Sequence, residues 1–151
     1  MRQAIERSLI AETSRDRAWS FLWDIEALAK CIPGCEDVIV EEPGKRYKAR
    51  MRRSVGPFLV RFELDIGVEQ CIPLERVQVM VTGQDKRLRS QIRQRVTVLL
   101  SSSQDGRCQI DLTADLQLDG MLASLGERLL GAQIEQEVDG FVRCIQGKLH
   151  D

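Results

Sequence analysis

Histidine is almost absent from the sequence: the single one, His150, is next to the last of 151 residues. A residue so close to a chain end is expected to fray, so a serine or cysteine nucleophile would lack a histidine base to activate it. Aromatic residues make up only 5% of the chain, and no apolar run approaches the eighteen or so residues that a membrane-spanning helix needs. These shortages disfavour a catalytic-triad hydrolase and an integral membrane protein.

Excess charge of either sign is also missing, because the formal net charge is −1. A chain with balanced charge has no general affinity for nucleic acid or for an anionic membrane. Basic residues do gather between Lys86 and Arg95, but the next predicted strand carries aspartates on the same face. Opposite charges across a strand pair ordinarily stabilise a sheet, so we expect no nucleic-acid partner.

The cysteines and the N-terminus bear on the compartment. The segment from Met1 to Glu6 is too polar for a signal peptide, which favours a cytoplasmic protein. Five cysteines in such a chain are expected to be reduced thiols. Cys31 and Cys35 flank Ile-Pro-Gly and could approach each other, but a zinc site needs about four ligands. We therefore expect both to be free thiols without metal, while a redox role for the pair stays open.

The length predicts one domain, residues 1–151. Gln3 to Ala11 mixes polar and apolar residues as an edge strand does. Two short helices are predicted next, one opened by a weak capping signal at Thr13 and one capped by Asp24. Pro33-Gly34 ends the second helix, because proline cannot continue it.

From Glu36 onward the apolar residues recur with a period of two, which is typical of half-buried β-strands. The clearest run is Val60 to Val68, where apolar residues alternate with charged ones, and Asp105-Gly106 is a turn signal between two later strands. The pattern predicts six or seven antiparallel strands that form a sheet with one apolar face and one charged face.

A long helix is predicted in the stretch from Asp119 to Leu149, where apolar residues recur at spacings of three and four. The apolar stripe turns by more than a quarter of the circumference near Gly131. Either the helix bends there or a short lead-in segment precedes the main helix. An α+β fold follows, in which this helix covers the apolar face of a curved sheet and encloses a cavity.

The cavity lining is predicted from the inward parity of the strands and from the helix stripe. Gln94 is polar, and its alternative role is an internal hydrogen bond. Acidic residues fall on the outward faces, so the lining has little with which to move protons. The expected lining is Ala49, Met51, Phe62, Leu64, Ile92, Gln94, Val96, Leu116, Leu125 and Leu129.

Three motifs resemble those of the family formed by the G subunit of carbon monoxide dehydrogenase. The run from Cys31 to Cys35 is similar to its Ile-Pro-Gly turn and Val55-Gly56-Pro57 to its Val-Gly-Pro turn. Gly120 to Leu129 resembles its Gly-x-Leu-Ala-x-Leu-Gly-x-Arg-Leu motif. The resemblance covers essentially the whole chain. It implies the helix-grip fold of the START-like (SRPBCC) superfamily, an antiparallel sheet that grips the C-terminal helix around an apolar cavity.

The same resemblance implies an accessory role beside molybdenum-containing carbon monoxide dehydrogenases and related hydroxylases, with a lipophilic quinone as the molecule handled. Some family members carry a tail associated with membrane attachment, whereas this sequence ends at Asp151, so we expect membrane contact to be transient at most. We expect a non-catalytic protein that binds a hydrophobic small molecule without cofactor or metal. Two alternatives stay open: a polyketide cyclase or dehydratase, and an assembly or protein-interaction module whose cavity is incidental.

Overall fold

The computed structural model describes residues 1–149, so His150 lies outside the described residues. Within them the chain forms a seven-stranded sheet in the order β1-β7-β6-β5-β4-β3-β2. All neighbouring strands are antiparallel, which confirms the predicted sheet. The strands are β1 (Arg2–Ala11), β2 (Cys35–Glu42), β3 (Arg46–Val55), β4 (Phe58–Ile72), β5 (Arg76–Asp85), β6 (Ser90–Ser102) and β7 (Cys108–Gly120).

The alternating pattern of the strands gives the sheet one apolar face. Along β4, Phe62, Leu64 and Ile66 are buried, whereas the charged residues between them are exposed. The register places Met51 of β3 beside Phe62 and Ala49 beside Leu64. Inward side chains of adjacent strands therefore meet, and they form a continuous apolar surface.

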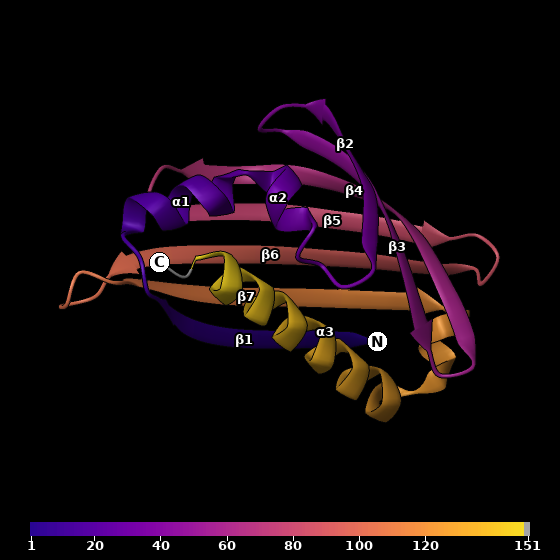
Figure 1. Cartoon of the computed structure of the whole chain (residues 1–151). Helices are drawn as coiled ribbons and strands as arrows, with labels where there is room; N and C mark the ends of the chain where they lie inside the picture. Colours follow the sequence, from indigo (N-terminus) through magenta and orange to yellow (C-terminus); the bar gives the residue numbers. More distant parts are fainter. Residues whose placement is uncertain (150–151) are drawn as a thin grey trace.

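Two short helices, α1 (Arg15–Trp23) and α2 (Ile25–Ala29), connect the edge strands β1 and β2. The cap of α1 is Ser14 and not Thr13: the Ser14 hydroxyl accepts a hydrogen bond from the Arg17 amide at 3.3 Å. Asp24 caps α2 as predicted, since its carboxylate accepts from the Ala27 amide at 3.2 Å. Both helices lie over the face of the sheet that the C-terminal helix also covers (Figure 1).

The C-terminal stretch begins with a short 3-10 helix, η1 (Met121–Leu125), and continues as α3 (Glu127–Lys148). Gly126 separates them with φ +90°, a conformation that favours glycine. The lead-in segment is thus the correct alternative, although the break falls at Gly126 and not at Gly131.

Ser90, the first residue of β6, fixes the start of η1. Its buried hydroxyl donates to the Leu88 carbonyl at 3.0 Å and accepts from the Leu122 amide at 2.9 Å. Gly120 allows the strand to turn into η1: a Cβ there would lie 1.9 Å from the Arg89 carbonyl oxygen, and φ is +98°.

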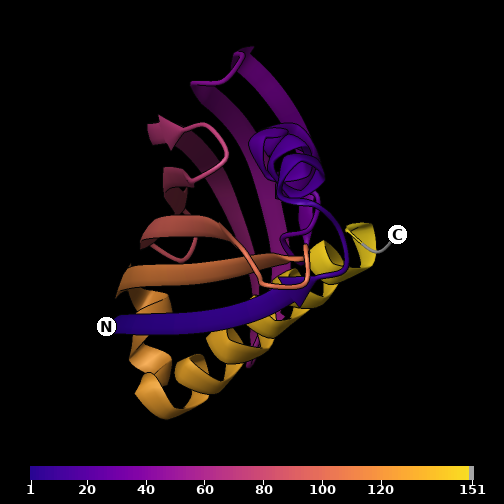
Figure 2. The same ribbon diagram turned by 90° about the vertical axis from the view of Figure 1, so that its left-hand side faces the viewer.

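Helix α3 crosses the concave side of the curved sheet (Figure 2) and is held at both borders. At the β1 border, Arg7 Nε donates to Asp139 Oδ1 at 2.9 Å. At the β3 side, Arg53 Nε donates to Glu137 Oε1 at 2.8 Å. These hydrogen bonds therefore attach the helix to strands at or near opposite edges of the sheet. Between them, only side chains fill the space under the helix.

A disulfide forms a third attachment of α3. Cys31, in the turn after α2, is bonded to Cys144 of α3, with their Cα atoms 5.5 Å apart. The expectation that Cys31 is a free thiol is therefore wrong. Cys144 lies 113 residues away in sequence, so only the fold brings the two sulfurs together. Cys35 is free and half-buried, and burial raises the pKa of its thiol.

Charged residues on the outer face pair across the sheet. Arg95 lies opposite Asp115 in the β6–β7 register, but its Nε donates to Glu69 Oε1 on β4 at 2.9 Å. This hydrogen bond is the main cause of a lowered pKa at Glu69. Arg95 of the basic stretch is thus paired within the sheet, although with a different carboxylate from the aspartates expected.

The β6–β7 hairpin turns at Asp105-Gly106 as predicted, with Gly106 at φ +81°. Arg107 Nε donates to Asp105 Oδ2 at 2.8 Å, and the Ser103 hydroxyl donates to the other carboxylate oxygen. These hydrogen bonds, that of Arg107 first, hold the pKa of Asp105 well below its usual range.

Candidate functional site

An apolar cavity of about 190 Å³ lies between α3 and the concave face of the sheet. Strands β3 to β7 supply its floor, and α2, the turn after it, η1 and α3 supply the rest. Helix α3 is held at the two sides of the sheet, and the inward strand residues beneath it are mainly Val, Leu, Ile and Ala. These side chains do not fill the whole space under the helix, and a space lined by apolar groups does not attract ordered water.

Seven of the ten residues predicted to line the cavity do so: Met51, Phe62, Leu64, Ile92, Gln94, Val96 and Leu116. All of them are strand residues whose inward parity was predicted correctly. Ala49 shares that parity and is buried, but it lies outside the lining. The role of these residues in binding a ligand stays a prediction.

Leu125 and Leu129 also lie outside the cavity lining. They lie near the β3–β4 turn: a Cβ on Gly56 would be 3.3 Å from a Leu129 methyl and 3.5 Å from one of Leu125. Leu129 is 45% exposed. Leu129 precedes the lining residue Leu130 by one position, which places it about 100° away around α3, whereas Leu122, at the start of η1, does line the cavity.

The helical wall comes from the later stripe: Leu130, Ile134, Val138 and Phe141. Its spacing of three and four is visible in the sequence, but the prediction took the earlier leucines. The turn residues Ile32 and Pro33 were missed as well. Pro33 packs closely on α3, since a Cβ on Gly140 would lie 3.3 Å from its Cγ.

Four polar side chains line the cavity within the described residues, and three of them form one cluster. Glu137 Oε1 accepts from Arg53 Nε at 2.8 Å, from Arg53 Nη2 at 2.5 Å and from Gln133 Nε2 at 2.7 Å. The fourth, Gln94, points inward from β6 as predicted. Its alternative role is not seen: among residues 1–149 no hydrogen bond to its amide is formed.

The polar cluster marks the border between the cavity and solvent. The Arg53 and Glu137 side chains are 37% and 24% exposed, whereas the lining residues Phe62 and Leu64 are 3% and 4% exposed. A molecule that enters between β3 and α3 therefore passes the cluster before it reaches hydrocarbon.

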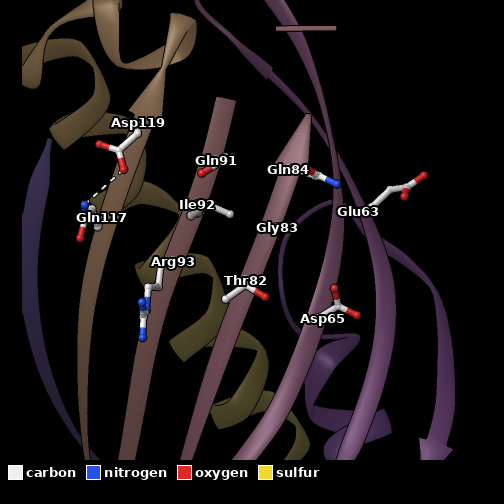
Figure 3. Close-up of a pocket in the computed structure, with 10 residues that line it drawn as sticks. All are labelled: Glu63, Asp65, Thr82, Gly83, Gln84, Gln91, Ile92, Arg93, Gln117 and Asp119. Carbon is white, nitrogen blue, oxygen red and sulfur yellow. Dashed lines mark hydrogen bonds between the residues drawn. The ribbon is translucent and has the colours of Figure 1, made fainter. Parts of the chain in front are cut away.

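The outer face of the sheet carries two shallow grooves, of about 420 and 430 Å³. Figure 3 shows the first, where Glu63, Thr82, Gln91 and Arg93 project from neighbouring strands on the side away from α3. These grooves are larger than the inner cavity, but they are open, and charged and amide side chains make up more than half of the residues that line each of them. A hydrophobic molecule gains little burial there, so the inner cavity is the better candidate site.

Two further findings concern metal binding and membrane spans among the described residues. Residues 1–149 hold no group of three or more His, Cys, Asp or Glu side chains arranged to bind a metal ion. No helix in that range is long and apolar enough to span a membrane.

Solved structures share this architecture. A conserved protein from Geobacillus kaustophilus aligns with a TM-score of 0.85 at 22% identity, covering 97% of this chain and 95% of that one. An aromatase/cyclase from Streptomyces sp. R1128 aligns at 0.71 and 15%, covering 99% and 94%. Ara h 8.0201 aligns at 0.69 and 14%, covering 99% and 98%. At these identities they establish the fold, which is the predicted helix-grip (START-like) fold.

Comparison with curated proteins gives no match. A family model gives a match that covers nearly the whole chain: CoxG, the G subunit of carbon monoxide dehydrogenase, matches over residues 10–150. That range includes all three motifs noted in the sequence. The chain therefore belongs to the CoxG family of carbon monoxide dehydrogenase subunits.

Proposed function

We propose that this protein is a non-catalytic binding protein for a hydrophobic small molecule. The observation that carries the proposal is the apolar cavity between α3 and the sheet, whose lining is hydrocarbon apart from four polar side chains among the described residues. Concave, mainly apolar spaces with a few placed polar groups are the usual form of small-molecule sites. Family membership supports an accessory subunit over an independent enzyme.

The size of the cavity sets the part of the ligand that it can enclose. A cavity of about 150 Å³ lined by leucine, isoleucine and phenylalanine accepts benzene, so 190 Å³ accepts one substituted ring or a short branched segment. A longer isoprenoid chain would extend past Arg53 and Glu137 into solvent or onto a membrane surface. The proposal therefore predicts that a lipophilic quinone binds with only its ring or one prenyl unit enclosed.

Burial of a ring supplies only part of a useful affinity. An aromatic ring that loses about 150 Å² of exposed surface gains roughly 4 kcal/mol at about 25 cal/mol per Å². That gain corresponds to a Kd of about 1 mM before other costs of association. Tight binding therefore needs additional contacts at the polar cluster or along the ligand's tail.

The accessory role includes a partner and a compartment. We propose that the bound molecule serves a molybdenum-containing carbon monoxide dehydrogenase or related hydroxylase, that residues 1–151 act as one domain, and that the protein works in the cytoplasm with transient membrane contact at most. Disulfides persist mainly in oxidising compartments. The Cys31–Cys144 bond would be protected in the cytoplasm by the burial of Cys31, which is 4% exposed.

An enzymatic function of the polyketide cyclase kind fits the lining less well. The aromatase/cyclase shares the fold at 15% identity, which says nothing of shared chemistry. Acid–base catalysis needs a group positioned to exchange a proton with the substrate. The acid in the lining, Glu137, already accepts three hydrogen bonds.

Filling the cavity tests the proposal. Val96 faces the cavity from the middle of β6, and Leu99 lies on the opposite, outer face of the same strand, 40% exposed. We expect Val96→Phe to reduce co-purification of an apolar molecule at least tenfold, measured by mass spectrometry after incubation with a quinone-containing lipid extract. Leu99→Phe is the matched control and should load like the wild type.

Two results would refute the proposal. One is equal loading of both variants, which would place the bound molecule outside the cavity. The other is chemical conversion of the released molecule by the purified protein.

A further inference from the structure

The charge balance of the cavity lining limits the ligand's polar group. Arg53 and Glu137 are the two charged side chains in the lining among residues 1–149. Arg53 Nε donates a hydrogen bond to Glu137 Oε1 at 2.8 Å. The lining therefore carries no net charge. An anionic head group would meet a carboxylate at the same place as the guanidinium, and neither would be free to pair with it.

The cluster nevertheless keeps unused hydrogen-bonding capacity. Its three hydrogen bonds converge on one oxygen, Glu137 Oε1. Glu137 Oε2 and Gln133 Oε1 remain as acceptors, and the guanidinium of Arg53 has five N–H donors, of which two are used here. A hydroxyl group could donate to the cluster, and a carbonyl oxygen could accept from it.

Gln94 adds a second polar contact on the sheet side of the cavity. Its amide is half-buried in an apolar wall, beside Leu116 in the β6–β7 register. A polar group in such surroundings is stabilised by a ligand oxygen or nitrogen that supplies the missing hydrogen bond.

We propose that the ligand carries a neutral oxygen group, a hydroxyl or a carbonyl, which binds at the Arg53–Gln133–Glu137 cluster while its apolar body fills the cavity. A carboxylate of the same shape is rejected because Glu137 neutralises Arg53 and repels a second anion. This inference rests on the proposed function and narrows it to a class of ligand.

Three single-ring probes of similar size distinguish binding in the cavity from recognition of a neutral oxygen group at the cluster. Ethylbenzene tests the cavity alone, para-ethylphenol adds a neutral oxygen, and para-ethylbenzoate adds an anionic one at neutral pH. We expect NMR titration to show ethylphenol binding at least threefold tighter than ethylbenzene and at least tenfold tighter than ethylbenzoate. Failure of all three to bind would contradict the proposed function itself. Binding of ethylbenzene together with ethylbenzoate at or above the affinity of ethylphenol would overturn only the inference about the head group.

A charge-removing variant tests the cause. Glu137→Gln leaves Arg53 uncompensated, so the preference for ethylphenol over ethylbenzoate should fall at least tenfold or reverse. Glu63→Gln removes the same charge from the exposed outer face and should keep the wild-type ratio. An unchanged ratio in Glu137→Gln would overturn the proposal.

A second variant serves if Glu137→Gln does not fold. Gln133→Leu keeps the Arg53–Glu137 pair but removes one neutral partner. It should weaken ethylphenol at least threefold and leave ethylbenzene unchanged. Equal weakening of both probes, or of neither, would count against a hydrogen bond at the cluster.

Discussion

Removal of the Cys31–Cys144 disulfide should destabilise the protein by several kilocalories per mole. The bond closes a loop of 113 residues, and the chain-entropy model gives about 4.8 kcal/mol for a loop of that length. Measured effects of native disulfides usually fall between about 2 and 5 kcal/mol. For a chain of 151 residues, a loss of about 4.8 kcal/mol corresponds to a fall of about 15 °C in Tm.

The measurement compares urea unfolding of the oxidised wild type with that of a variant carrying Cys31→Ser and Cys144→Ser. The double variant avoids leaving one unpaired thiol beside the cavity. Cys71→Ser is the matched control, because that cysteine is exposed and free, and it should unfold at the wild-type midpoint. Peptide mapping under non-reducing conditions would identify the bonded pair directly.

The size of the stability loss also distinguishes the Cys31–Cys144 bond from a bond between Cys31 and Cys35, which are close in sequence. A bond between Cys31 and Cys35 would close a loop of about four residues and contribute only about 1.9 kcal/mol in the same model. Loss of about 2 kcal/mol, together with a mapped Cys31–Cys35 peptide, would refute the structural assignment. Equal stability of oxidised wild type and double variant would refute the entropic reasoning.

Three further predictions concern the frame around the cavity. Ser90→Ala should cost about 1–3 kcal/mol of unfolding free energy, measured in urea, because it leaves the buried amide that opens η1 without its partner; an effect below about 0.5 kcal/mol would contradict this role. Gly120→Ala should lower the unfolding free energy by at least about 3 kcal/mol, because the new Cβ would meet a backbone oxygen at 1.9 Å. Gly106→Ala, also at positive φ but in open space, should lower it by about 1 kcal/mol. Equal losses would show that the structure relieves the clash at Gly120. Asp105 has a lowered pKa in the folded state through its hydrogen bond with Arg107, so its contribution is present above its unfolded pKa of about 3.9 and is lost as pH falls through the lower folded value. Asp105→Asn should therefore reduce the loss of stability on acidification below about pH 4, and an unchanged acid profile would contradict this.

The sheet was predictable from sequence because the alternation of apolar and polar residues along each strand indicates which face is buried. Val60 to Val68 alternates strictly, and a register shift of one residue would expose Phe62 and Leu64. The antiparallel order followed from turn signals such as Asp105-Gly106. Seven of the predicted lining residues were found for this reason.

The errors have a different origin, since they depend on contacts between distant parts of the chain. The lead-in segment was among the predicted alternatives, but the break at Gly126 depends on how η1 meets Ser90 and the β3–β4 turn. Leu125 and Leu129 were assigned to the cavity, but they lie beside Gly56 in the β3–β4 turn. The disulfide joins a turn to the last helix, whereas spacing in sequence favoured a contact with Cys35.

The polar cluster was missed as well. Arg53 shares the inward parity of Met51 and Val55, and Glu137 lies three residues after Ile134 in the apolar stripe of the helix, so spacing alone could have placed both in the lining. The two side chains form their hydrogen bond only because α3 crosses the sheet, so no local sequence pattern predicts it.

The central claim is that a hydrophobic molecule binds inside the cavity between α3 and the sheet. Its most direct test is a methyl NMR titration of the wild-type protein with para-ethylphenol. We predict saturable shifts at Met51, Val79 and Val96, which line the cavity, and none at the outer-face methyl groups of Thr82 and Leu99. Shifts confined to Thr82 and its neighbours in the outer groove, or no saturable shift at any cavity methyl, would contradict it.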